Sequence, residues 1–122
     1  MGSHNDLGKE GEDRAAVWLA EKGFEILVRN YRYGKAEVDL IAKYDRFIVF
    51  VEVKTRSNSI HGYPEEAVTS SKQKLMMSAA SNYLYENKLE CECRFDVISV
   101  LKSANNNWEF THFEDAFFLY DD

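Results

Sequence analysis

The sequence predicts one α/β domain in which a mixed β-sheet is flanked by helices, with the element order αβββαββ. Two segments repeat their apolar residues with helical periodicity, and five shorter segments alternate or are apolar throughout, as strands are. A chain of 122 residues with 45% hydrophobic residues can bury one core. No repeat or Pro/Gly/Ser-rich linker divides it, so we expect residues 1–122 to form a single domain, with residues 1–5 flexible or partly derived from cloning.

Two helices are expected. The first covers residues 7–22, because its apolar and small residues form one stripe, Asn5 or Asp6 can cap its start, and Gly23 supplies a left-handed stop. The second covers residues 71–87 and carries one apolar face of Leu, Met, Ala and Tyr side chains. Each helix can therefore cover one face of a sheet.

Five strands are expected, at residues 24–32, 36–42, 47–54, 92–101 and 108–113. The third is apolar on both faces until Glu52, which is typical of a central strand covered on two sides. The last is expected at an edge of the sheet. Tight turns are expected at Gly34 and at residues 43–46, and a loop at residues 57–70.

The composition excludes several classes of protein. The longest apolar run is far shorter than the roughly 18 residues of a membrane helix, and no secretory leader is recognisable, so we expect a cytoplasmic protein with no membrane partner. Cys91 and Cys93 stand one residue apart, which suits neither a disulfide framework nor a four-ligand zinc site. The histidines lack the spacing of a metal site and are expected at the surface or in loops: His4, His61 and His112.

The net charge of -6 argues at first against a nucleic-acid partner. The charge is uneven, however: residues 1–60 hold ten basic and ten acidic side chains, whereas residues 61–122 hold five and eleven. The segment from Arg29 to Arg56 is net basic. An anionic ligand is therefore expected to bind in the first half of the chain.

The second and third strands place several charged residues on one face. If they form a hairpin with a two- or four-residue connection, Asp39 stands opposite Phe50 and Glu37 opposite Glu52. Side chains alternate along a strand, so Glu37, Asp39 and Glu52 then share a face with Lys54. A three-residue connection would send the two groups to opposite faces.

Three carboxylates held together are costly unless a cation neutralises them, and oxygen ligands suit Mg²⁺ or Mn²⁺ better than zinc. Glu12 adds a further carboxylate, because it lies about 60° from the centre of the apolar stripe of the first helix. The alternative for Glu12 is a boundary residue that pairs with a basic group.

These residues resemble a known group of enzymes. The pattern of Glu12, Glu37-Val38-Asp39 and Glu52-Val53-Lys54 is similar to the PD-(D/E)xK nuclease superfamily, in the arrangement of archaeal Holliday junction resolvases. More closely, residues 8–12, 36–42 and 49–56 resemble the small bacterial YraN family, whose members are uncharacterised. The resemblance implies a restriction-endonuclease-like fold and hydrolysis of DNA phosphodiesters, with branched or repair intermediates as candidate substrates.

The resemblance also implies roles for individual residues. Asp39 and Glu52, with the backbone carbonyl of Val53, would hold Mg²⁺ or Mn²⁺; Lys54 would position the attacking water, and Glu12 would support a metal or its hydration shell. Glu37 is a secondary candidate whose alternative is an ion pair with a neighbouring arginine.

Further residues are candidates for nucleic-acid contact: Thr55, Arg56, Lys72, Gln73, Arg29 and Arg32. Exposed basic side chains are also common on ordinary solvated surfaces. Arg94 and Asp96 share one face of a later strand and could support the site, although an ion pair explains them equally well.

Three functions remain open from the sequence. The first is a metal-dependent nuclease or nuclease-like protein acting on DNA, alone, as a homodimer or with a repair protein. The second is a non-catalytic nucleic-acid-binding accessory module in repair or recombination. The third is a structural adaptor whose charged patch is an ion-pair network.

Overall fold

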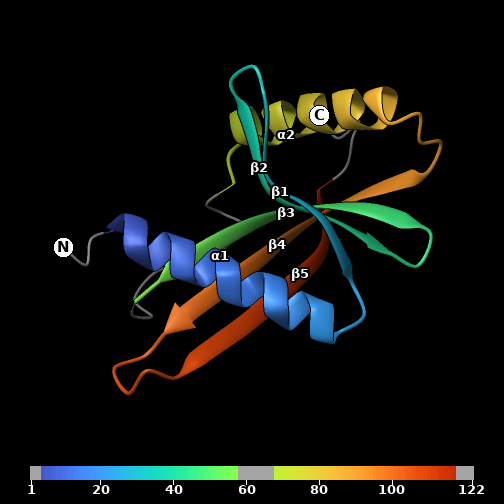
Figure 1. Ribbon diagram of the computed structural model, residues 1–122. Coiled ribbons are helices and arrows are strands. Elements are labelled where there is room, and N and C mark those ends of the chain that lie inside the picture. Colours follow the sequence, from blue (N-terminus) through green and yellow to red (C-terminus); the bar gives the residue numbers. More distant parts are fainter. Residues whose placement is uncertain (1–3, 58–67, 118–122) are drawn as a thin grey trace.

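The computed structural model describes residues 4–57 and 68–117, and its elements follow the predicted order (Figure 1). The element bounds are α1 His4–Glu21, β1 Glu25–Tyr33, β2 Ala36–Tyr44, β3 Phe47–Arg56, α2 Ser70–Glu86, β4 Glu92–Lys102 and β5 Trp108–Phe117. The helix α1 begins earlier than expected, and β5 ends later. Most of the loop expected at residues 57–70, including His61, lies outside the described residues.

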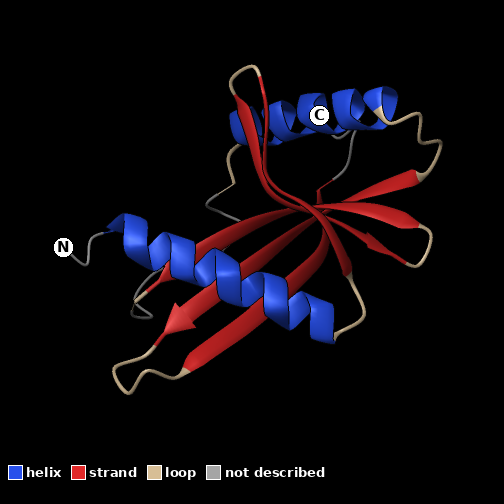
Figure 2. Cartoon of the chain, viewed as in Figure 1, coloured by secondary structure: helices blue, strands red, loops and turns tan. Residues whose placement is uncertain are grey.

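The five strands form one mixed sheet in the order β1-β2-β3-β4-β5. Neighbouring strands are antiparallel except β3 and β4, which are parallel. Parallel neighbours need a crossover connection, and α2 lies in the segment that supplies it. The two helices lie on opposite faces of the sheet (Figure 2), so the predicted α/β fold class is confirmed.

The central strand β3 contributes to two separate hydrophobic clusters. Ile48 and Phe50 pack in the cluster that contains the buried face of α2, whereas Val49 and Val51 pack in the cluster that contains α1. All four side chains are buried, which confirms the prediction of a strand covered on both faces. Glu52 follows directly in this buried strand and is itself only 4% exposed. Within the described residues, no helix is long and apolar enough to cross a membrane.

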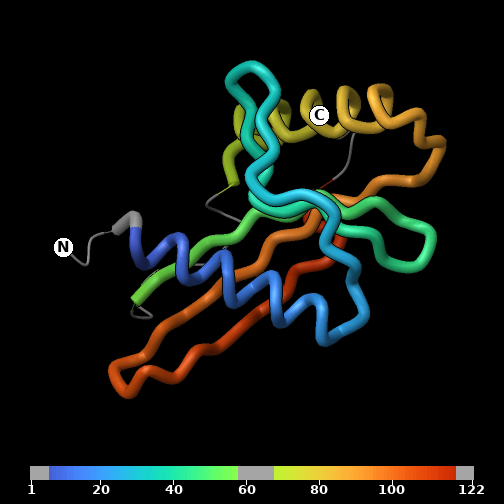
Figure 3. The backbone as a smooth tube through the Cα atoms, viewed as in Figure 1, coloured from blue at the N-terminus to red at the C-terminus, as the bar shows by residue number. Residues whose placement is uncertain are grey.

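The strand β2 changes the face that it presents at Asp39. Val38 packs in the α2 cluster and Leu40 in the α1 cluster, although residues two apart share a face in a flat strand. On the neighbouring strand, Asn30 has a left-handed φ of 55° at the same level. Figure 3 shows the resulting bend in the path of β1 and β2. Asp39 thus lies where the hairpin of β1 and β2 leaves the plane of the sheet.

The register between β2 and β3 differs from the predicted one by two residues. Ile41 pairs with Phe50 rather than with Ile48, and the ladder runs to Tyr44 and Phe47. The expected pairing is correct only for a four-residue connection at residues 43–46, whereas the strands are joined by a two-residue turn in which Asp45 has a left-handed φ of 56°. A shift of two preserves the alternation of side chains over the paired residues 40–44 and 47–51, but Asp39 lies beyond this ladder, where β2 changes face.

Gly11 sets the distance between α1 and β3. A Cβ atom at Gly11 would lie 2.7 Å from Cγ2 and 2.9 Å from Cβ of Thr55, so the helix approaches the strand as closely as a glycine allows. By contrast, a Cβ atom at Gly8 on the same helix would meet nothing within 4 Å. This close approach fixes the position of Glu12, the next residue of the helix.

We expect Gly11→Ala to lower the free energy of unfolding by about 1–3 kcal/mol, because α1 must move away from a β-branched side chain. Gly8→Ala is the control and should be neutral or stabilising by up to about 1 kcal/mol, since alanine favours a helix. Urea denaturation of both variants measures the difference. Equal stability of the two variants would contradict the close approach.

Candidate functional site

The site begins where β2 and β3 separate. Their backbone ladder ends at the pair of Leu40 and Val51. Beyond it, the backbone N–H of Val53 donates a hydrogen bond of 2.8 Å to Oδ2 of Asp39. The side chain thus satisfies a backbone donor of the neighbouring strand and holds Asp39 against β3.

Glu52 lies beside Asp39 and is held by two lysines. Lys54 Nζ is 3.2 Å from Oε2 of Glu52, and Lys72 Nζ of α2 is 3.5 Å from Oε1. The side chain of Glu52 is only 5% exposed, whereas both lysines reach the surface. Lys72 makes an ion pair without a hydrogen bond: Oε1 of Glu52 is the one buried side-chain oxygen or nitrogen of the described residues that has no hydrogen-bond partner.

Glu12 approaches from α1 and completes a group of three carboxyls. It is within hydrogen-bonding reach of Asp39, and its Oε1 is 3.9 Å from Nη2 of Arg29. The same Arg29 nitrogen donates a hydrogen bond of 2.6 Å to Oδ1 of Asp13. Arg29 therefore links β1 to two carboxylates of α1. The structure brings together Glu12, Asp39, Glu52 and Lys54, the four residues that the sequence motif indicates.

The carboxyls resist ionisation in this arrangement. Burial and the charge of Glu52 raise the pKa of Asp39 from its ordinary value of 3.8 to about 8, although the N–H of Val53 opposes the rise. Burial also raises the pKa of Glu12, against the lowering effects of its hydrogen bond to Asp39 and of Arg29. The charges of Glu37 and Glu52 add to the rise in the pKa of Glu12, so the clustered carboxyls oppose one another's ionisation.

The ammonium groups of Lys54 and Lys72 are the cations that contact Glu52 in the described part of the site. Among the residues that the structure describes, no three Asp, Glu, His or Cys side chains are arranged as a set that could hold a metal ion. The donor atoms at this point are nevertheless all oxygens, the ligands that Mg²⁺ and Mn²⁺ prefer. A buried carboxylate oxygen without a hydrogen bond is also suited to accept a cation.

The other predicted contact residues have different environments. Glu37 pairs with Arg32 at 3.6 Å, as its alternative interpretation required, and Arg32 remains 74% exposed. Gln73 contacts its own segment of the chain: its Nε2 donates a hydrogen bond to the backbone carbonyl of Val68. Thr55 packs against Gly11 of α1. Arg56 lies partly exposed at the end of β3.

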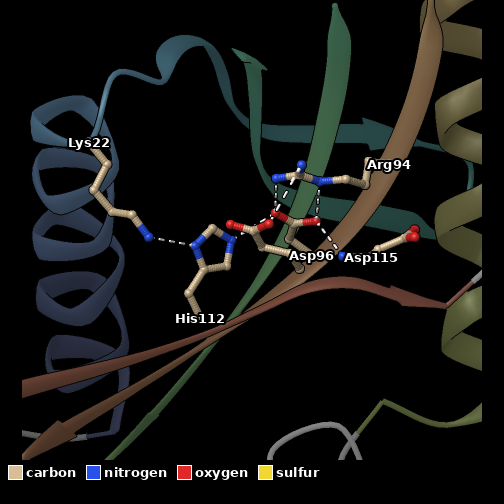
Figure 4. A network of polar contacts seen from close by, with 6 residues as sticks. Lys22, Arg94, Asp96, His112 and Asp115 are labelled. Carbon is tan, nitrogen blue, oxygen red and sulfur yellow. Dashed lines mark hydrogen bonds and ion pairs between the residues drawn. The ribbon is translucent and has the colours of Figure 1, made fainter. Parts of the chain in front are cut away.

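Figure 4 shows a second buried polar group, which includes Arg94, Asp96 and His112. It lies on the α1 side of the sheet, because His112 packs against Phe24 of the α1 cluster. Asp96 of β4 is 0% exposed and accepts hydrogen bonds from Nε and Nη2 of Arg94, at 3.0 and 2.8 Å. The backbone N–H of Asp115 donates a third, at the irregular point of the ladder between β4 and β5. Arg94 and Asp96 therefore form an ion pair along one strand and do not reach the three carboxyls.

His112 of β5 completes this network and was not anticipated from the sequence. Its side chain is 5% exposed, which contradicts the expected surface or loop position. Lys22 can only donate, so its contact of 3.1 Å with Nδ1 leaves the proton on Nε2, which donates to Asp96 at 2.7 Å. Burial alone would raise the pKa of Asp96, but the hydrogen bonds from His112 and Arg94 lower it below its ordinary value.

A hollow of about 460 Å³ lies on the outer side of α1, against Phe110 of β5. Its lining includes Glu10, Asp13 and Val17 of α1 but none of the three clustered carboxyls. The hollow is therefore distinct from the candidate site.

Comparison with known proteins identifies the family of the chain. A family model described as "Uncharacterised protein family UPF0102" matches residues 11–100. A UPF0102 protein of Flavobacterium psychrophilum is 44% identical over 98% of this chain and 100% of its own length. Another, from Chlorobium limicola, is 47% identical over 93% of this chain and 92% of its own length. The chain therefore belongs to the uncharacterised protein family UPF0102, the YraN-type family that its motifs resemble.

Proposed function

We propose that this protein is a metal-dependent nuclease that hydrolyses DNA phosphodiesters. The observation that carries the proposal is the convergence of Glu12, Asp39 and Glu52 beside Lys54. These side chains come from one helix and two strands and include a buried carboxylate oxygen without a hydrogen bond. Glu52 and Glu12 both raise the pKa of Asp39, an unfavourable arrangement of like charges that a structural ion-pair network does not require.

The residues fit a divalent metal by the chemistry of their donors. Asp39 and Glu52, together with the backbone carbonyl of Val53, would hold Mg²⁺ or Mn²⁺, and Glu12 would support it. Such an ion lowers the pKa of bound water and neutralises charge on the phosphoryl oxygens. Asp39 must release its proton to act as a ligand, so metal affinity is expected to rise with pH.

The remaining residues of the site would orient the attacking water and bind phosphates. Lys54 is fixed by Oε2 of Glu52 and is 30% exposed, so its ammonium can still donate a hydrogen bond to an attacking water. Arg32 and Arg56 are exposed or partly exposed near the same hairpin and strand end, where they can contact phosphates. Because the whole chain carries a net charge of -6, we expect modest affinity that depends on the metal or on a partner.

A second candidate is a non-catalytic nucleic-acid-binding accessory module. It is favoured by the pairing of both lysines with Glu52, which already neutralises the carboxylate. The third reading, an adaptor, predicts no appreciable affinity for DNA at any salt concentration.

The test is incubation of the protein with Mg²⁺ or Mn²⁺ and single-stranded, duplex, flapped and four-way-junction DNA, with structured RNA beside them. We expect cleavage of at least one DNA that EDTA abolishes. Salt-sensitive binding without cleavage would favour the accessory module instead. Equal cleavage by wild type and Lys54→Ala would reject the site and indicate a contaminant.

A further inference from the structure

Lys72 occupies an unfavourable place in α2 unless Glu52 holds it there. It lies in the first turn, and its backbone N–H donates to the capping hydroxyl of Thr69. The positive end of the helix dipole disfavours a lysine here, and the first turn contains no acidic residue that would compensate it. Its ammonium is 3.5 Å from Oε1 of Glu52, so the buried carboxylate offsets this cost.

Two lysines contact Glu52 from different elements of the fold. Lys54 Nζ lies 3.2 Å from Oε2 of Glu52, and Lys72 Nζ lies 3.5 Å from Oε1. Lys54 belongs to the same strand as Glu52, whereas Lys72 reaches the site from a separate helix. Lys72 is also the lysine that pairs with the oxygen lacking a hydrogen bond.

We infer that Lys72 neutralises Glu52 in place of a divalent cation and is released from this carboxylate when such a cation binds. The inference rests on the proposed function, because it concerns the same metal-binding carboxylates. It assigns Lys72 a role in the metal-free protein: its ammonium occupies the side of Glu52 where a divalent cation would bind.

The test is a titration with Mn²⁺ alone, followed by calorimetry, of wild type, Lys72→Met, Lys72→Arg and Lys74→Met. Removing the competing charge should make Mn²⁺ bind about tenfold more tightly to Lys72→Met. Lys72→Arg keeps the charge and should bind as wild type does. Lys74→Met is the matched control, because Lys74 is exposed and lies two residues along the same helix.

Thermal unfolding supplies a second readout that is independent of cleavage. Without metal, Lys72→Met should have a lower Tm than wild type, because Glu52 loses a counter-charge. Saturating Mn²⁺ should close this gap in Tm, because it binds Lys72→Met more tightly and therefore stabilises this variant more than it stabilises wild type. A simple packing defect would leave the gap unchanged and would overturn the inference.

The outcomes also separate this inference from the proposed nuclease function. If Mn²⁺ binds Lys72→Met no more tightly than wild type, Lys72 is not a substitute cation, and metal-dependent cleavage by wild type would still support the nuclease. If none of the four proteins binds Mn²⁺, the inference and the metal-dependent function fail together.

Discussion

Replacing Asp96 with alanine should lower the free energy of unfolding by about 3–5 kcal/mol, the largest loss of stability that we expect from a single side chain. The substitution leaves the guanidinium of Arg94, 10% exposed, without its bidentate partner. It also removes the acceptors of His112 and of the Asp115 N–H, which fasten β5 at its irregular point. Since small domains are stable by only about 5–15 kcal/mol, the variant should lose a large share of its stability at 25 °C.

Urea denaturation measures this effect, and Glu92→Ala on the same strand is the control. Glu92 pairs with Arg46, but the two side chains are 63% and 67% exposed, so its loss should cost less than about 1 kcal/mol. The double variant Arg94→Met/Asp96→Ala should recover part of the loss, because it removes the uncompensated charge. Strict additivity of the two single substitutions would contradict the buried ion pair.

The same network predicts the response to acid. The folded-state pKa of Asp96 is depressed, so its contribution is complete above the unfolded value near 3.8 and is lost as pH falls through the lower folded value. The advantage of wild type over Asp96→Asn should therefore shrink below about pH 4. A difference in stability that stays constant down to pH 2 would argue against an ionised Asp96.

The order of the elements was predictable because each depends on local periodicity. The apolar stripe of residues 7–22 and the doubly apolar run in β3 carry this information in adjacent residues. The register of β2 on β3 was not predictable from the sequence, because it depends on whether Asp45 adopts a left-handed conformation. The proximity of Asp39 to Glu52 depends both on a register shift of an even number of residues and on the change of face at Asp39, which the sequence does not reveal.

The site was predictable where charged residues interrupt apolar patterns, as Asp39, Glu52 and Lys54 do in their strands. The contact of Lys72 with Glu52 joins residues 20 positions apart, and only the packing of α2 on the sheet determines it. The burial of His112 likewise depends on β5 meeting β4 and α1. The sequence held one signal for this burial: His112 alternates with Trp108 and Phe110 in the expected strand and so shares their apolar face.

Asp39→Asn should abolish metal-dependent cleavage and at the same time stabilise the protein. The amide cannot supply the negative charge that a metal requires, so we expect cleavage to fall by at least about 10³-fold. The amide oxygen can still accept the hydrogen bond from Val53, so the fold is retained. Stability should rise, on the order of 1–3 kcal/mol at pH 8, because burial and Glu52 oppose the charge of Asp39.

The direction of the expected change in stability follows from the raised pKa of Asp39. Below the unfolded value near 3.8 the carboxyl is protonated in both states, and wild type and variant should be equally stable. As pH rises towards about 8, ionisation favours the unfolded wild type, so the advantage of Asp39→Asn should grow and then level off. Thermal unfolding from pH 4 to pH 9, paired with the cleavage assay, measures both effects. Loss of activity with loss of stability would mean that Asp39 is structural, whereas loss of activity with a gain that grows with pH is expected of a carboxylate kept for its chemistry.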